Sequence, residues 1–230
     1  MGFFANLKGQ KAMNAHGKAE YDKALKLYGE AYDEGMNQVR LLRGYSVLLI
    51  RTQQFDKALE VLKKMEKLPM QPKEKADLHI NYAIILWQKG HLERAMQILE
   101  DVFRHNKNGM IYSIIGYLKI EQGNAEEALA FNQEALEYDE QDPVFLDNLG
   151  QTYYRLYNDK VAAKPYFEKA LERKPEAIDT NYFLAHYAID DGDYAKAREY
   201  LETAKAGFFS PLNYATPEKI ESLLEQIAGK

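Results

Sequence analysis

The feature that most constrains this chain of 230 residues is an internal repeat with a period of 33 to 37 residues. Each copy contains two segments in which apolar or small residues recur at intervals of three and four, the spacing of one helix face. The clearest copy covers residues 143–175. A period near this length is typical of helix-turn-helix solenoids. The sequence therefore predicts an array of helical hairpins.

Three columns of small or apolar residues stay in register over six copies. The column in the second segments consists of Ala24, Ala58, Ala95, Ala128, Ala163 and Ala197. The column in the first segments consists of Ala12, Ser46, Ala83, Gly116, Gly150 and Ala185. A third column consists of Ala31, Met65, Val102, Ala135, Ala170 and Ala204. Because a residue with little or no side chain lets two helices approach closely, we expect Gly150 and Ala163 to lie at a helix crossing.

The copies resemble the tetratricopeptide repeat (TPR) family. The resemblance is carried by NLGQTYY and YFEKALERKP in residues 143–177, IIGYLKIEQGNAEEALAFNQEALEYD in 109–142, YFLAHYAIDDGDYAKAREYLETA in 178–211 and YAIILWQKGHLERAMQILEDV in 76–108. The second copy has Gln53 where the turn usually has Gly. In the first copy, Lys8 and Lys11 replace the usual apolar residues, so the resemblance rests there on AEYDKALKLYGEAYDEG.

This resemblance covers roughly residues 5–211 and implies an all-α fold, a right-handed α-solenoid. We expect one solenoid domain over residues 1–215 and a C-terminal capping helix over 216–230. The expected helix-turn-helix units cover residues 5–38, 39–72, 76–108, 109–142, 143–177 and 178–211.

Turn residues agree with this division. Gly90, Gly123 and Gly192 fall at the ends of first helices, where a left-handed residue can close a helix. Asn124 and Asp193 follow two of them and are suited to cap the next helix.

Two stretches depart from the pattern. Residues 156–163, LYNDKVAA, lack Gly and contain one extra residue, which we expect on the surface turn. Residues 67–75 form a longer connection with Pro69 and Pro72, and Pro cannot continue a helix. This break is interpreted either as a plain longer loop, which we favour, or as a hinge between a two-repeat and a four-repeat segment.

The two ends of the chain differ in apolar content. Thr216 is a suitable N-cap before Pro217, and a following apolar stripe predicts a helix that covers the open end of the last repeat. That stripe consists of Ile220, Leu223, Leu224 and Ile227. Near the start, Phe3, Phe4 and Leu7 are apolar with no earlier repeat to cover. We expect them to fold back on the first unit or, alternatively, Phe3 and Phe4 to form a self-association surface.

Composition restricts location and partners. Charged residues make up 28% and hydrophobic residues 46%, as in soluble globular proteins. No apolar run approaches the ~20 residues that span a bilayer, so membrane insertion is not expected. There are no Cys residues, which excludes disulfides and thiolate chemistry. No secretory leader is evident, so we expect a cytoplasmic location unless a leader or anchor has been trimmed.

The charge is uneven along the chain. Residues 1–75 carry 14 Lys and Arg against 9 Asp and Glu, and residues 76–230 carry 16 against 26, which gives the net charge of −5. The basic first part could steer an acidic partner towards the protein, although an ordinary solvated helix surface is the simpler interpretation. The negative total argues against nucleic acid as a partner.

No catalytic or cofactor motif is present. The sequence has no phosphate-binding loop, no GxGxxG, no GxSxG and no HExxH. The five His residues fall at unrelated positions, so a zinc site is not expected. Asp190, Asp191 and Asp193 are interpreted as turn and capping residues rather than as a calcium loop. We expect no enzymatic activity, no cofactor and no metal.

The resemblance implies that first helices line a concave groove that binds a peptide or protein segment. Rotation by 100° per residue places a mixture of amide, Arg and aromatic side chains there. The candidate groove residues are Arg40, Arg43, Asn81, Trp87, Tyr117, Asn148, Gln151, Arg155 and His186. Trp87 could equally belong to the core, and the amides could simply be solvated. We expect Arg40 and Arg43 to meet acidic groups of a partner.

One TPR function is disfavoured by the residues present. The clamp that holds a chaperone C-terminal carboxylate uses Lys or Arg and Asn at fixed positions of three successive repeats. At most two of its five positions are matched here, and the cations that would pair the carboxylate are missing. The predicted function is therefore a protein–protein interaction scaffold. The alternative is a regulatory or sensor module whose superhelix changes pitch when it binds a small peptide or effector.

Overall fold

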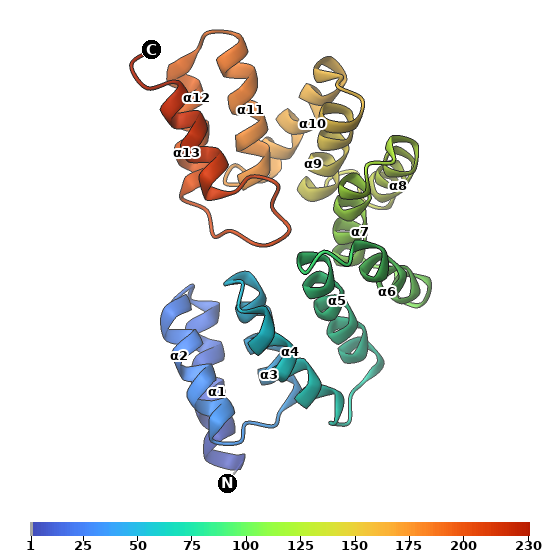
Figure 1. Ribbon diagram of the computed structural model, residues 1–230, viewed down its shortest axis with the longest axis vertical. Coiled ribbons are helices and arrows are strands. Elements are labelled where there is room, and N and C mark those ends of the chain that lie inside the picture. The colour runs from blue at the N-terminus through green and yellow to red at the C-terminus, as the bar shows by residue number, and fades with distance from the viewer. Residues whose placement is uncertain (1) are drawn as a thin grey trace. The chain divides into compact units, whose positions relative to one another are not determined.

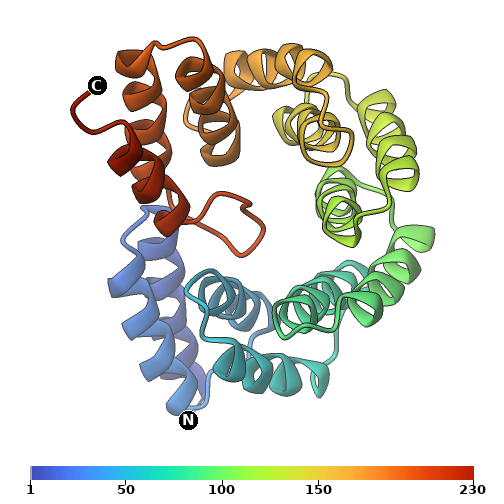
Figure 2. The ribbon, with the colours of Figure 1, turned by 45° about the horizontal axis from the view of Figure 1, so that its top comes forward.

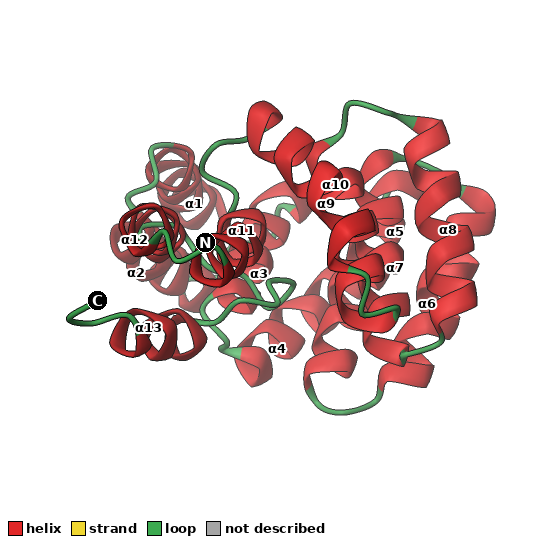
Figure 3. Ribbon diagram, turned by 90° about the horizontal axis from the view of Figure 1, so that it is seen from above, coloured by secondary structure: helices red, strands yellow, loops and turns green. Residues whose placement is uncertain are grey.

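All regular elements are helices in the computed structural model of the chain, which describes residues 2–230 (Figure 3). The chain divides into two compact units, with the boundary between Asn106 and Lys107. The first unit contains α1 (Gly2–Gly17), α2 (Tyr21–Asp33), α3 (Val39–Arg51), α4 (Phe55–Glu66), α5 (Pro72–Gln88) and α6 (Leu92–His105). The all-α prediction is confirmed for these residues and for those of the second unit.

The second unit begins with the fourth repeat. It contains α7 (Gly109–Gln122), α8 (Ala125–Tyr138), α9 (Pro143–Gln151), the π-helix η1 (Thr152–Leu156), α10 (Lys160–Arg173), α11 (Ile178–Asp190), α12 (Tyr194–Lys205) and α13 (Pro217–Gln226). In each unit the helices pack in antiparallel pairs in chain order, such as α1 with α2 and α11 with α12 (Figure 1). Successive pairs within a unit are also in contact.

The columns of small residues lie in the core, as predicted. All six Ala residues of the second-helix column have no exposed surface, and Ala12, Ser46, Ala83 and Ala185 of the first-helix column have none either. The role of Gly150 is more specific than the sequence indicates. A Cβ atom at this position would lie 2.8 Å from Cε1 of Phe167, so the glycine makes room for a buried ring of α10.

The predicted turn and cap residues are confirmed. Gly90, Gly123 and Gly192 have φ values of 85°, 82° and 76°, in the left-handed region. The side chain of Asn124 accepts a hydrogen bond from the N–H of Glu127, as an N-cap does. Asp193 and Thr216 likewise cap α12 and α13.

The extra residue of the fifth repeat lies in a helix and not in the turn, so the sequence-based expectation is wrong. Residues 157–159 form a loop of three residues, as do 52–54 and 191–193. The additional residue is accommodated by η1, where the N–H of Tyr157 donates to the carbonyl of Thr152 at 3.4 Å, five residues earlier. A π-helical turn inserts one residue without lengthening the loop and is frequent at functional sites.

The connection between the second and third repeats is a loop within one packed unit. Pro72 begins α5, and the N–H of Gln71 donates to Oε2 of Glu74 at 2.8 Å in a capping box. The helices on either side, α4 and α5, pack against each other. The plain loop is therefore supported, and nothing here indicates a hinge at this position.

The two ends behave differently from each other. Helix α13 packs beside α12 (Figure 2), and Ile220 of α13 and Ile227 directly after it are fully buried in a cluster with Leu201 of α12, so the predicted capping helix is confirmed. Phe3, Phe4 and Leu7 of α1 are 76%, 74% and 50% exposed, so the expectation that they fold back on the first repeat is wrong. Self-association through Phe3 and Phe4 stays a prediction. None of the helices in residues 2–230 is both long and apolar enough to span a lipid bilayer.

Candidate functional site

The first helices of the second unit carry a network of polar side chains and a cluster of rings. We call this surface the first-helix face. It is formed by Tyr117 and Glu121 of α7, Asp147 and Gln151 of α9, Arg155 of η1, and Asp179, Tyr182, Phe183 and His186 of α11. Spacings of four residues, as in Asp147, Gln151 and Arg155, place these side chains on one side of each helix.

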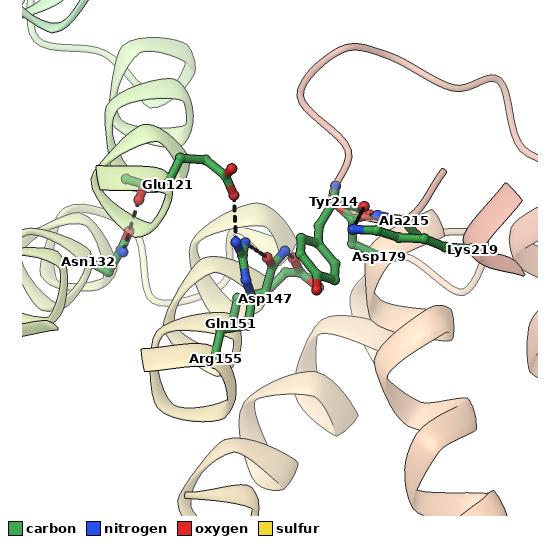
Figure 4. A network of polar contacts seen from close by, with 10 residues as sticks. Glu121, Asn132, Asp147, Gln151, Arg155, Asp179, Tyr214, Ala215 and Lys219 are labelled. Atoms are coloured by element: carbon green, nitrogen blue, oxygen red, sulfur yellow. Dashed lines mark hydrogen bonds and ion pairs between the residues drawn. The ribbon is translucent and has the colours of Figure 1, made fainter. Parts of the chain in front are cut away.

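Arg155 is at the centre of the polar network (Figure 4). Its Nη2 donates to Oε1 of Glu121 at 2.6 Å, which joins two successive first helices. Its Nη1 donates to Oε1 of Gln151 at 3.0 Å. The guanidinium also lies 4.0 Å from the ring centroid of Tyr214, in cation–π contact. The planar fork of Arg suits these simultaneous contacts, which a Lys could not reproduce.

Asp147 extends the network into the protein interior. Nε2 of Gln151 donates to Oδ2 of Asp147 at 2.7 Å, and the Thr180 hydroxyl donates to Oδ1 at 2.7 Å. Burial raises the pKa of Asp147, and the negative charge of Asp179 raises it further. The two hydrogen bonds and the charge of Arg155 oppose this rise in the pKa.

Asp179 binds the loop between α12 and α13, residues 206–216. Its Oδ2 accepts from the N–H of Tyr214 at 3.1 Å and from Nδ2 of Asn213 at 3.3 Å. Its Oδ1 accepts from the N–H of Ala215 at 2.9 Å. Burial raises the pKa of Asp179, whereas these three donors stabilise its charged form and lower the pKa.

Tyr214 lies against the ring cluster. Its ring is stacked on that of Phe183, with the centroids 5.3 Å apart and the planes at 20°. Nζ of Lys219 lies 3.3 Å from the centroid of Tyr214 and donates to the carbonyl of Tyr214 at 2.9 Å. A cation is therefore placed near this ring by α13 in addition to Arg155.

The ring cluster continues along α11. The rings of Phe183 and Phe167 are stacked at 4.9 Å, and His186 contacts Tyr182 edge to face at 4.9 Å. Burial lowers the pKa of His186, and the nearby charge of Lys160 lowers it further. His186 is thus favoured in its neutral form within an aromatic surface.

Comparison with known proteins identifies the repeat. A tetratricopeptide repeat family model matches residues 148–211, and a second one matches residues 111–142. Residues 111–142 and 148–211 are therefore tetratricopeptide repeats. No curated protein matches this TPR chain.

Solved structures agree on an all-α TPR solenoid. A TPR protein from Parabacteroides merdae ATCC 43184 is 14% identical, with 97% of this chain and 84% of that chain covered and a TM-score of 0.74. The type IV pilus biogenesis factor PilW is 20% identical, with 97% and 100% covered and a TM-score of 0.65. A chain of the APC/C hetero-tetramer Cut9–Hcn1 is 12% identical, with 96% and 42% covered and a TM-score of 0.68. At these identities the likeness shows the TPR fold alone.

Several predicted groove residues of this TPR protein have internal partners in the second unit. Gln151 has no exposed surface and is bound on both sides, by Asp147 and Arg155. Asn148 is 2% exposed, and its Nδ2 donates to the carbonyl of Ser113 at 3.0 Å. Tyr117 is also buried, and burial raises its pKa. Direct contact of these side chains with a partner stays a prediction.

In the first compact unit, which ends at Asn106, the predicted groove residues do not form one network. Arg43 makes an ion pair with the buried carboxylate of Asp77, so its acidic partner lies within the chain. Arg40 is exposed and donates to Gln10. Asn81 is 8% exposed and its Nδ2 lies 3.4 Å from Oγ of Ser46. Trp87 is half-buried, between the two alternatives given for it.

The first TPR unit also contains a cavity that the sequence did not indicate. It has a volume of about 480 Å³ and lies among α4, α5 and α6. Its apolar residues include Leu62 and Leu78, and its charged residues are Lys63, Glu66 and Asp101. None of the nine predicted groove residues lines it. Among the described residues, no three His, Asp or Glu side chains are grouped so that they could hold a metal ion.

Sequence reasoning missed the part of the site that lies outside the repeats. Asp179, Tyr214 and Lys219 were not identified as site residues, because two of them follow the last repeat and Asp179 resembles an ordinary first-turn acid. One signal was available. Residues 207–215, GFFSPLNYA, are too apolar for a solvated loop, which indicates that the loop packs on something.

Proposed function

We propose that this TPR chain is a non-enzymatic interaction scaffold that binds a peptide or protein segment on the first-helix face of its second unit. The observation that carries the proposal is that the loop of residues 206–216 already lies on that face. Asp179 and Phe183 already hold a non-helical stretch of the same chain, through two backbone N–H groups and a stacked Tyr ring. A surface that binds polypeptide in this way has the donors, acceptors and rings that peptide recognition requires.

Two further points support the proposal. TPR proteins are generally interaction scaffolds, and one of the similar structures belongs to a hetero-tetramer. The network of Arg155, Glu121 and Gln151 also fixes the side chains of the face before any partner arrives. A preorganised surface loses less conformational entropy when it binds. The sensor alternative is not favoured, because its cue was the break at 67–75, which is a loop between packed helices.

The proposal is tested by selecting peptides from a displayed library on the whole chain and mapping them by hydrogen exchange. We expect selected peptides to protect amides of α7, α9 and α11. His186→Ala should weaken their binding about tenfold, because one aromatic anchor on the face is removed. The matched control is His105→Ala, which removes an exposed His from α6 in the first unit.

Protection confined to the second helices α8, α10 and α12 would contradict the proposal. Equal weakening by both His substitutions would also contradict it, since the effect would then not depend on the first-helix face.

A further inference from the structure

The loop of residues 206–216 occupies the first-helix face as a ligand would. Asp179 receives the consecutive N–H groups of Tyr214 and Ala215 and the side-chain amide of Asn213. Hydrogen bonds to a carboxylate are among the stronger ones, and a free segment could donate the same bonds, because two of the three come from the backbone.

Side-chain recognition is concentrated in one residue of the loop. The Tyr214 ring lies on Phe183, with the guanidinium of Arg155 at 4.0 Å and the ammonium of Lys219 at 3.3 Å from its centroid. An aromatic ring between a ring and two cations is a typical interface anchor. The face therefore holds an aromatic residue, Tyr214, and the backbone N–H of the residue after it, Ala215.

Hydrogen bonds within the loop hold residues 210–213 in a turn. The N–H of Ser210 donates to Oδ1 of Asn213 at 2.9 Å, and the N–H of Asn213 donates back to the carbonyl of Ser210 at 3.0 Å. The N–H of Leu212 donates to Oγ of Ser210 at 3.0 Å. These bonds form a closed turn within residues 210–213, so a short peptide of the same sequence can form it too.

The helix after the loop has its own anchor. Thr216 caps α13, and Ile220, Leu224 and Ile227 are buried in the core cluster. Residues 207–214 are half-exposed. Ala215 of the loop is fully buried in the same cluster, so residues 207–214 are the part that can leave the first-helix face while α12 and α13 stay packed.

From these contacts, and resting on the proposed function, we propose the partner class and the regulation of this face. The face binds a partner segment of the type Asn-aromatic-small, and residues 206–216 are a built-in competitor that such a segment displaces. Because the loop is part of the same chain, its effective concentration at the face is on the order of millimolar. A partner segment must therefore bind tightly enough, or be concentrated enough, to displace the loop, so weak partners are excluded from the face.

The test uses the whole chain and a labelled synthetic peptide of residues 210–217, SPLNYATP. Fluorescence polarisation should show weak binding to the unaltered chain. Binding to the Tyr214→Ala chain should be at least about tenfold tighter, because the competing ring is absent. A peptide in which the Tyr is replaced by Ala should lose binding to both. Tyr138→Ala is the matched control, since it removes an exposed Tyr from α8 and should leave the affinity unchanged.

Two further measurements locate the peptide. Asp179→Asn added to the Tyr214→Ala chain should reduce the affinity about tenfold, because the charged acceptor for the two N–H groups is lost. In the unaltered chain at saturating peptide, hydrogen exchange at the Ala215 amide should accelerate as the loop leaves Asp179. Circular dichroism verifies that each variant is folded.

Equal affinity of the unaltered and Tyr214→Ala chains would overturn the inference, as would no binding to a folded Tyr214→Ala chain. Unchanged exchange at Ala215 would overturn it as well. If library peptides protect α7, α9 and α11 but do not compete with SPLNYATP, only this inference fails and the proposed function stands.

Discussion

The two units use the same pair of positions on successive first helices, with different charges. In the first unit, Arg43 lies three residues before the small residue Ser46 of α3, and Asp77 lies six residues before the small residue Ala83 of α5. Arg43 and Asp77 make an ion pair. The pair joins two repeats directly and leaves Asp77, which is 8% exposed, with a cation beside it.

The same two positions of α9 and α11, counted from Gly150 and Ala185, are Asp147 and Asp179. Both side chains are buried, and each has a raised pKa. Two acids at a repeat junction repel each other when both are charged. In this place the junction therefore opposes packing instead of supporting it.

The difference shows why the second unit recruits groups from outside the repeat. An opposite-charge pair is satisfied by its two members, whereas two like charges need hydrogen-bond donors from their surroundings. Thr180 and Gln151 supply donors to Asp147, and the backbone of Tyr214 and Ala215 supplies them to Asp179. Two acids on a first-helix face thus accept hydrogen bonds from N–H groups outside the repeat, whereas the members of an ion pair satisfy each other.

The largest effect is expected when the first unit is given two neighbouring acids that have no hydrogen-bond donors supplied from a loop. Arg43→Asp should lower the free energy of unfolding by about 2–4 kcal/mol near neutral pH, because it removes a cation and adds repulsion beside a buried carboxylate. Thermal unfolding followed by circular dichroism measures the loss. Part of the stability should return near pH 4, where acids become protonated.

The control for this change is Arg94→Asp, which alters the charge equally on the exposed side of α6. Its effect should remain within about 0.5 kcal/mol. An equal loss in both variants would mean that total charge, and not the Arg43–Asp77 junction, determines stability.

A second change tests how closely α10 packs on α9 at Gly150. Gly150→Ala places a Cβ atom 2.8 Å from the Phe167 ring, which has no exposed surface and is stacked on Phe183. We expect a loss of about 1–3 kcal/mol in thermal unfolding, as is typical of overpacking. A better helix propensity for Ala offsets only about 1 kcal/mol of it.

Gly29→Ala is the matched substitution in the first unit. A Cβ atom there would lie 3.5 Å from the Tyr45 hydroxyl, which is an ordinary contact. This variant should be neutral or slightly stabilised through helix propensity. If Gly150→Ala were stabilised as well, the close fit of Phe167 over α9 would be refuted.

Part of the fold could be predicted from the sequence. The columns of small residues predicted the helix pairs, because buried positions recur with the helix period. The Gly residues predicted the turns at Gly123 and Gly192, and the apolar stripe after Pro217 predicted the capping helix. Which side chain fills the space over Gly150 could not be predicted, since that depends on the rotation of α10. The π-turn η1 was missed because a π-turn and a longer loop require the same number of residues.

The candidate site was predictable only in part. The first helices were the correct place to look, and Gln151 and Arg155 belong to the network there. The sequence pattern gives the side of the helix but not the partners, so it could not show that Asn148 and Gln151 are used internally. The contact between Asp179 and residues 213–215 joins positions one repeat length apart, 34 to 36 residues, but residues 213–215 follow the last repeat and lie outside the columns, so the pattern did not indicate it.

The smallest expected effect is the pH dependence of the unfolding free energy that the two acids Asp147 and Asp179 produce. Asp147 and Asp179 have raised pKa values, so the folded chain retains their protons at a pH where the unfolded chain has released them. Their protonation stabilises the fold fully below the ordinary carboxyl pKa of about 4, and this contribution is lost as the pH rises through the raised values.

Asp147→Asn removes one of the two buried carboxyl groups whose pKa is raised. Between about pH 5 and pH 8, the unaltered chain should lose about 1 kcal/mol more of unfolding free energy than the Asp147→Asn chain. The difference between the two chains is the relevant quantity, because His186, whose pKa is lowered, changes stability in the opposite direction over this pH range in both. Chemical denaturation at the two pH values measures it. Parallel pH profiles for the two chains would mean that Asp147 carries the same charge folded and unfolded, and the acid pair would then place no demand for donors on the loop.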